Sequence, residues 1–165
     1  MSASRANRLQ LILVMALLVL LHFYLRPRLW NARVSPDFLL LALFFLAMRA
    51  GPGAGALAGF VVGVVSDALT PAAFGAGALA HTVVGYLAAW GRAVFFADNL
   101  LVNAAFVAVA VWVRDLLLLL ASGTPQGTLL TELMLNSPLQ ALSTGAFALL
   151  VLVAFRQWFA IRLDV

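Results

Sequence analysis

Apolar residues fill almost the whole chain, in runs that only single charged residues and turn-forming residues interrupt. Apolar types make up 65% of the 165 residues, and charged types make up only 10%. A soluble domain is typically about 45–50% apolar and about 25% charged, so a soluble fold would have too little polar surface to cover this chain. A bilayer removes that problem. Because a spanning helix takes roughly 20 residues, the chain has room for about six spans and almost no domain outside the membrane.

These runs predict an all-α fold, a polytopic integral membrane bundle of about six transmembrane helices in a single domain over residues 1–165. The predicted spans cover about residues 9–25, 36–48, 54–69, 74–91, 99–121 and 138–155. Ser35, Pro36 and Asp37 suit the beginning of the second helix, with Ser at the cap, Pro at the first helical position and an acid in the first turn.

The second and third helices are short for a bilayer. At about 1.5 Å per residue, residues 36–48 would be roughly 20 Å long, whereas the hydrocarbon core is roughly 30 Å thick. A tight turn over residues 49–53 joins the two helices. We favour full spans for both, and the alternative is a re-entrant hairpin.

Residues 122–137 are predicted to connect the last two spans outside the membrane or at its surface. Within them, apolar residues recur at helical spacing at Leu129, Leu130, Leu133 and Met134. This pattern indicates either an interfacial helix or the beginning of a longer last helix that is kinked at Pro138. Both interpretations remain open at this point.

The ten basic residues are all Arg and are scattered singly along the chain, which is not the clustered pattern of a nucleic-acid-binding surface. They bear on orientation instead. With the N-terminus in the cytoplasm, the inner side carries Arg5, Arg8, Arg49, Arg92, Arg156 and Arg162. The outer side then carries only Arg26, Arg28 and Arg33. The positive-inside rule therefore predicts that both termini are cytoplasmic.

Residue types that carry catalysis or bind metals are scarce. The chain has no Cys, which excludes a disulfide, a thiolate metal site and a Cys nucleophile. Its two His residues, His22 and His81, do not have metal-ligand spacing. GxSxG, P-loop and GxGxxG motifs are absent as well. We therefore expect no enzyme activity, no cofactor and no metal.

Four glycines follow one another at intervals of four residues, at Gly51, Gly55, Gly59 and Gly63, and Asp67 continues the series. Four residues turn a helix by about 40° beyond one full turn, so these positions form a slanted stripe. Small residues let another backbone approach closely, which is how helices associate in a bilayer. The stripe packs either against the next helix of this chain or against the span of a separate protein, and we favour internal packing.

A few polar residues lie within the predicted spans. Asp67 and His81 are close enough along the chain to pair; otherwise Asp67 is a solvated or Arg-paired surface group, and His81 is a hydrogen-bonded interior side chain. Asn103, Arg114 and Asp115 lie in the predicted span 99–121. An intramembrane charge is costly and normally faces the protein interior or water. Because adjacent helical residues diverge by about 100°, Arg114 and Asp115 need not pair, and they are either a functional site or a structural ion pair.

Several motifs resemble the MreD family of bacterial rod shape-determining membrane proteins. The resemblance covers about residues 34–95 and rests on Ser35-Pro36-Asp37, on the segment Arg49 to Phe60, on Gly63-Val64-Val65-Ser66-Asp67-Ala68-Leu69, on Phe74-Gly75 and on Val83-Val84-Gly85-Tyr86-Leu87. The flanking helices agree with the family mainly in number and length.

The resemblance implies a non-enzymatic subunit of the cell-elongation machinery in the bacterial cytoplasmic membrane. Its implied partners are the single-span protein MreC, the glycan polymerase RodA with its class B penicillin-binding transpeptidase, and the MreB filament. The family is also similar in architecture to the substrate-binding subunits of small-molecule, vitamin-type transporters, which is the alternative function. If the protein is a scaffold, we expect a helix-docking surface that involves the glycine stripe, Asp67, Arg114 and Asp115. His81 and Asn103 are expected to be further intramembrane polar residues.

Overall fold

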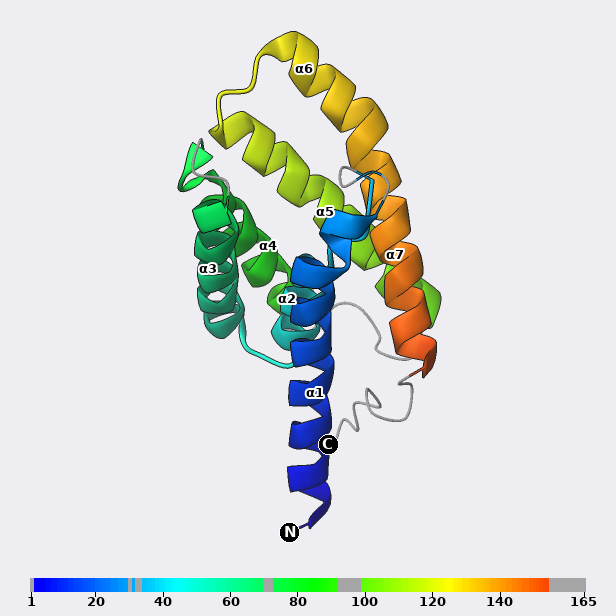
Figure 1. Ribbon diagram of the computed structural model, residues 1–165. Coiled ribbons are helices and arrows are strands. Elements are labelled where there is room, and N and C mark those ends of the chain that lie inside the picture. The colour runs from blue at the N-terminus through cyan, green and yellow to red at the C-terminus, as the bar shows by residue number, and fades with distance from the viewer. Residues whose placement is uncertain (1, 30, 32–33, 70–72, 92–98, 155–165) are drawn as a thin grey trace.

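The computed structural model describes residues 2–29, 31, 34–69, 73–91 and 99–154, and within these ranges the chain is helical and contains no β-strand. In chain order, the elements in Figure 1 are α1 (Ser2–Tyr24), the 3₁₀ turn η1 (Arg26–Arg28), α2 (Phe38–Ala47), α3 (Pro52–Leu69), α4 (Ala76–Gly91), α5 (Leu100–Ala121), α6 (Gln126–Thr131), the π-helical segment η3 (Glu132–Asn136) and α7 (Ser137–Ala154). The predicted all-α fold is confirmed.

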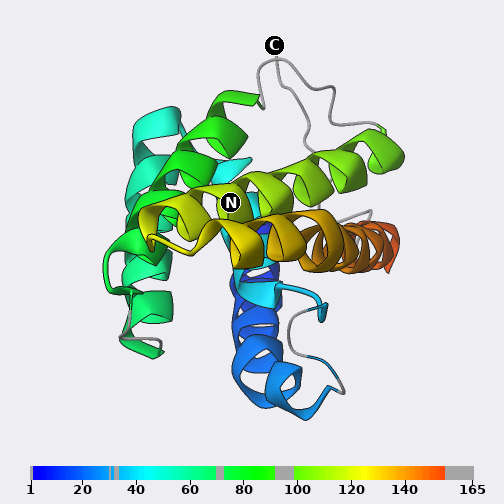
Figure 2. The same cartoon turned by 90° about the horizontal axis from the view of Figure 1, so that it is seen from above.

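Several of these helices have the length and composition of membrane spans. Four stretches of the described chain qualify, namely Leu9–Arg28, Pro52–Leu69, Leu100–Ala121 and Gln126–Ala154. Seen from above, α5 and the helix formed by α6 and α7 run side by side across the bundle, with α3 and α4 to one side (Figure 2). The fold is that of a polytopic membrane bundle.

Helix α2 lies inside the bundle and contacts α1, α3, α4, α5 and α7. Nine of its ten residues are buried, as expected for a helix that is apolar on every side. At about 1.5 Å per residue it is about 15 Å long, half of a hydrocarbon core of roughly 30 Å. This is the length of a half-span. The helix is shorter than the predicted residues 36–48, because it begins only after Asp37 and ends at Ala47. A full span for this segment stays a prediction.

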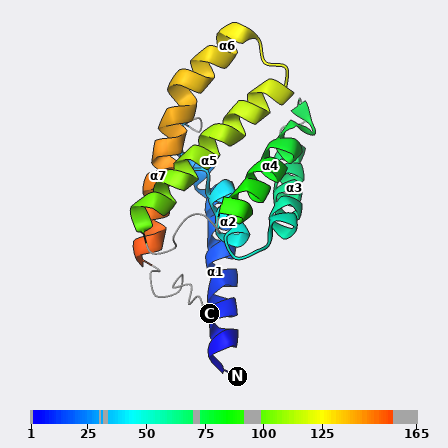
Figure 3. The same ribbon diagram turned by 180° about the vertical axis from the view of Figure 1, so that it is seen from behind.

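Helices α3 and α4 pack against each other more closely than any other pair of helices, as Figure 3 shows from behind. Gly55, Gly59 and Gly63 are buried in this contact. A Cβ atom at any of them would overlap the backbone of α4, at Gly85, at His81, or at Gly77 and Ala78 respectively. Internal packing of the stripe is confirmed for these three glycines.

This packing argues against docking of a separate protein at Gly55, Gly59 and Gly63. Helix α4 of the same chain already fills the place in which a partner helix would lie. Gly51 differs from the other three, because it lies in the turn before α3, is exposed, and has no atom within 4 Å of a Cβ built on it.

The region before Pro138 is the beginning of a long last helix. Residues Gln126–Ala154 are helical throughout, with η3 as the only interruption of α-helical geometry. Pro138 has no N–H to donate to the preceding turn, and at this point the Ser137 N–H bonds to the Glu132 oxygen, five residues back. The continuous helix favours the longer last helix over a separate interfacial one. The position of residues 122–137 outside the membrane or at its surface stays a prediction.

The outer faces of the helices are strongly apolar. More than half of each of these leucines is exposed: Leu13 and Leu20 on α1, Leu57 on α3, and Leu142 and Leu150 on α7. Such surfaces suit lipid or another transmembrane protein. Helix α1 is the most exposed of the candidate spans, with only 11% of its apolar window buried, and it projects beyond the bundle at the end where it begins (Figure 1).

Candidate functional site

Asp37 lies at the centre of a buried polar network. It is the N-cap of α2, and its Oδ1 accepts hydrogen bonds from the Leu39 and Leu40 N–H groups at 3.1 and 3.0 Å. We had expected Ser35 at the cap and Asp37 in the first turn, so the helix begins two residues later than predicted. A carboxylate at this position satisfies free N–H groups and faces the positive end of the helix dipole.

Arg114, on α5, joins Asp37 to Asp115. Its Nη2 lies 2.5 Å from Asp37 Oδ2, and its Nη1 lies 3.0 Å from Asp115 Oδ1. All three side chains are buried. We had expected that the neighbours Arg114 and Asp115 need not pair, but the forked guanidinium reaches both carboxylates at once. A buried charge in this site is therefore matched by an opposite charge.

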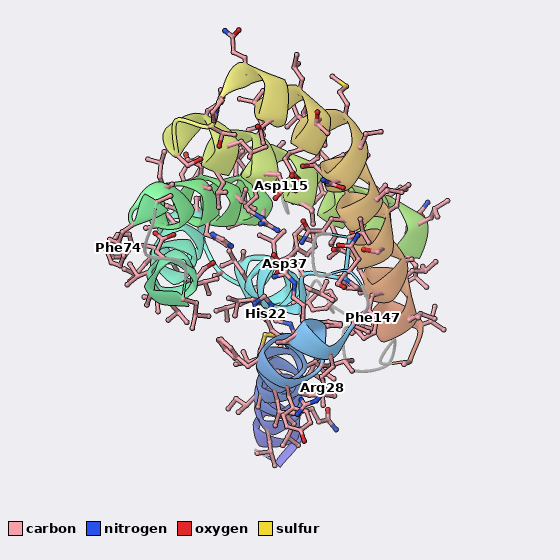
Figure 4. The ribbon with its side chains drawn as sticks, turned by 45° about the horizontal axis from the view of Figure 1, so that its top comes forward. His22, Arg28, Asp37, Phe74, Asp115 and Phe147 are labelled. Carbon is pink, nitrogen blue, oxygen red and sulfur yellow. The ribbon has the colours of Figure 1, made fainter. Side chains whose placement is uncertain are left out.

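Helices α1 and α7 also reach this network. His22 Nδ1 accepts the Leu39 N–H at 3.2 Å and lies 3.4 Å from Asp37 Oδ1. Thr144, fully buried on α7, accepts the Asp37 N–H at 3.0 Å and donates to the Gln140 oxygen at 2.7 Å. Figure 4 shows His22, Asp37 and Asp115 in succession through the middle of the molecule. The network therefore ties α1, α2, α5 and α7 together.

Asp67 performs a second capping role, at the beginning of α4. Its two carboxylate oxygens accept three backbone N–H groups, those of Gly75, Gly77 and Ala78, each at 2.9 Å. Only 3% of Asp67 is exposed. We had expected a solvated or Arg-paired group near the unfavourable end of α3; this is corrected, because the following chain folds back and offers the favourable end of α4 instead.

Asp67 and His81, which we considered close enough along the chain to pair, each have other hydrogen-bond partners. His81 Nδ1 bonds to the Gly77 oxygen at 2.8 Å, within α4, and the side chain is 2% exposed. This is the hydrogen-bonded interior side chain that we gave as the alternative. Asn103 is buried on α5, about three turns before Arg114. The interactions described above bring together Arg114 and Asp115 but leave Asp67, His81 and Asn103 outside the Asp37 network.

Sequence reasoning missed Asp37, His22 and Thr144 as members of one site. A signal was present for Asp37, because the predicted spans place it and Arg114 near the same surface of the membrane. An acid and a base at similar depth are natural partners in a bilayer, where an unpaired charge is costly. Thr144 offered no such signal, since its role depends on how α7 packs beside α2.

The chemistry of this site is that of cohesion between helices. Each charged group is held by an opposite charge or by backbone N–H groups within the protein. Among the described residues, no group of three His, Cys, Asp or Glu side chains is placed to hold a metal ion. The site is therefore suited to fixing the bundle in one arrangement.

Comparison with known proteins agrees with this architecture. The family model of the rod shape-determining protein MreD matches residues 5–159, which is nearly the entire chain and extends well beyond the motifs over residues 34–95. Searches of the curated proteins and of the solved structures found no match. On the strength of the family match, the chain belongs to the MreD family of rod shape-determining membrane proteins.

Proposed function

We propose that this protein is a non-enzymatic scaffold subunit of the bacterial cell-elongation complex, which it serves by binding MreC and thereby supporting peptidoglycan synthesis. One observation carries the proposal: the buried charges are used to hold the bundle together, and the outer surface consists of apolar helix faces. A protein built in this way acts through its helix surfaces. RodA, its class B penicillin-binding transpeptidase and MreB are the further partners proposed.

The surface proposed for MreC is the exposed face of α1. The glycine stripe is filled by α4, so a docking partner needs another surface. Leu13 and Leu20 are two turns apart on one side of α1, and they are 57% and 60% exposed. Helix α1 is the least buried of the candidate spans. It is also an uninterrupted α-helix of 23 residues, so a single-span partner can pack along it.

The proposal is tested by co-purification with MreC. Leu13→Ala combined with Leu20→Ala should reduce the amount of MreC recovered, because packing contacts drive helix association in lipid. The matched control combines Leu142→Ala with Leu150→Ala, which removes leucines of similar exposure, 67% and 65%, from α7. Undiminished recovery with the α1 variant, or equal loss with both variants, would contradict the proposed surface.

The alternative function is that of a substrate-binding subunit of a vitamin-type transporter. Such a subunit needs an enclosed polar cavity, whereas the polar hollow between α5 and α7, of about 150 Å³, is open to the outside. A water-soluble small molecule other than a lipid, found at one equivalent in the purified protein and bound tightly enough to survive purification, would favour the transporter over the scaffold.

A further inference from the structure

A groove lined mainly by polar residues lies between α5 and the long last helix. It has a volume of about 150 Å³ and is lined by Asp115, Leu118, Leu119, Glu132, Asn136, Ser137 and Gln140. At roughly 30 Å³ for each water molecule in the liquid, this is room for a group of several heavy atoms. Figure 4 shows Asp115 at this upper part of the bundle.

One of the residues that line the groove has a buried side-chain polar atom without a hydrogen-bond partner. Gln140 is only 5% exposed, and its side-chain Nε2 has no hydrogen-bond partner among the described residues. A buried donor left unsatisfied costs about 1–3 kcal/mol. A ligand in the groove that presents an oxygen to Gln140 would remove this cost.

The walls of the groove favour a cation. Two of the lining residues, Asp115 and Glu132, are acids, and none is basic. Asp115 is fixed in place by Arg114 and by the Ser137 hydroxyl, and Glu132 is oriented by a 2.8 Å hydrogen bond from Asn136. Glu132 and Asn136 both belong to the π-helical segment η3. Such segments occur frequently at functional sites.

The rim of the groove is apolar. Leu118 and Leu119 line it. Elsewhere on η3, Met134 and Leu135 are 64% and 60% exposed. A polar pocket that opens between exposed apolar side chains suits a ligand with a small polar head and a long apolar tail. The three features together describe an amphiphile whose head combines N–H donors with an oxygen acceptor.

We propose that this groove binds the headgroup of a lipid that carries a primary ammonium group, of which phosphatidylethanolamine is the type. The ammonium N–H groups would bond to the carboxylates of Asp115 and Glu132, and a phosphate oxygen would accept the Gln140 N–H. Phosphatidylcholine has the same charge distribution but no N–H on its nitrogen, so it cannot form the first set of bonds. Phosphatidylglycerol has no cation at all.

The test uses the full-length protein in nanodiscs that contain equal amounts of these three lipids, followed by native mass spectrometry of the lipid that stays bound. We expect one molecule of phosphatidylethanolamine to be retained at about ten times the level of phosphatidylcholine, the ratio that corresponds to about one charge-assisted hydrogen bond. Equal retention of the two lipids would overturn the proposal. Binding of free ethanolamine with no retained lipid would overturn the assignment to a lipid.

Two variants locate the site. Gln140→Leu removes the unsatisfied amide, and Glu132→Gln removes one charge from the rim, where Glu132 is only half-buried. Each should lower retention of phosphatidylethanolamine by about tenfold. Gln126→Leu, the same change at an exposed position outside the groove, is the matched control and should leave retention unchanged. If Gln140→Leu does not fold, the Glu132→Gln variant provides the test on its own. Retention of phosphatidylethanolamine at the wild-type level in that variant would overturn the proposal that the lipid binds in this groove.

Discussion

At the scale of single residues, the Asp37 carboxylate and the Arg114 guanidinium hold together parts of the chain that are 77 positions apart. Burying either charge alone costs several kcal/mol, and an ion pair recovers that cost only with good geometry and additional hydrogen bonds. Both conditions are met here, since Asp37 also accepts two backbone N–H groups and Arg114 also reaches Asp115. The pair is therefore sensitive to the loss of one member.

Replacing Arg114 by Leu should lower the free energy of unfolding by about 3–5 kcal/mol, because two carboxylates then remain buried without their counter-charge. Combining Arg114→Leu with Asp37→Asn should cost clearly less than the sum of the two single changes, because Asn still caps α2 but carries no charge. Thermal unfolding in detergent measures both effects. Simple additivity of the two changes would show that the residues are not coupled.

At the scale of elements, the contact between α3 and α4 depends on the absence of side chains. The two helices approach so closely that Gly59 lies against the backbone of α4 at His81 and Thr82. A backbone cannot yield as a flexible side chain can. Gly77 contributes in the same way, because a Cβ there would overlap the Asp67 carboxylate that caps α4.

Gly59→Ala should destabilise the protein by about 1–3 kcal/mol through overpacking. The matched control is Gly53→Ala in the same helix, where a new Cβ meets no atom within 4 Å. This control should be neutral or stabilising by up to about 1 kcal/mol, because Ala favours a helix more than Gly does. Equal effects of the two changes on thermal unfolding would contradict the close packing at Gly59.

Elements that depend on local patterns could be predicted from the sequence. Residues 54–69 and 99–121 were expected to be helical, and the helices span Pro52–Leu69 and Leu100–Ala121. The beginning of α2 and the π-helical segment before Pro138 could not be predicted, because the first depends on the contacts of Asp37 and the second on how the chain rearranges around a missing N–H. The site residues differ in the same way. Arg114 and Asp115 could be predicted as intramembrane charges from the sequence, whereas Asp37, their partner in the network, is distant in sequence and was not predicted as such.

At the scale of the whole molecule, α1 begins and α7 ends at the same end of the bundle (Figure 1). The turns before α2 and between α5 and α6 lie toward the other end. From the count of Arg in the sequence, we propose that this end faces the cytoplasm. The short buried α2 fits this arrangement, because it is surrounded by helices and needs no contact with lipid on either side.

The proposed orientation can be measured with single cysteines, since the chain has none of its own. A membrane-impermeant thiol reagent added to spheroplasts should label Ser122→Cys, in the turn between α5 and α6, but not Ser2→Cys, at the beginning of α1. Permeabilised cells should label both variants and so provide the control. The reverse pattern would place the termini outside.

We propose that the helical bundle supports rod shape through the outer face of α1. The length-to-width ratio of cells that are depleted of the protein and supplied with a plasmid-borne copy tests this proposal. We expect depleted cells to become round, the wild-type chain and the Leu142→Ala/Leu150→Ala variant to restore rods, and the Leu13→Ala/Leu20→Ala variant to fail although it is present in the membrane at normal amounts. Depleted cells that remain rods, or rods fully restored by the α1 variant, would contradict the claim.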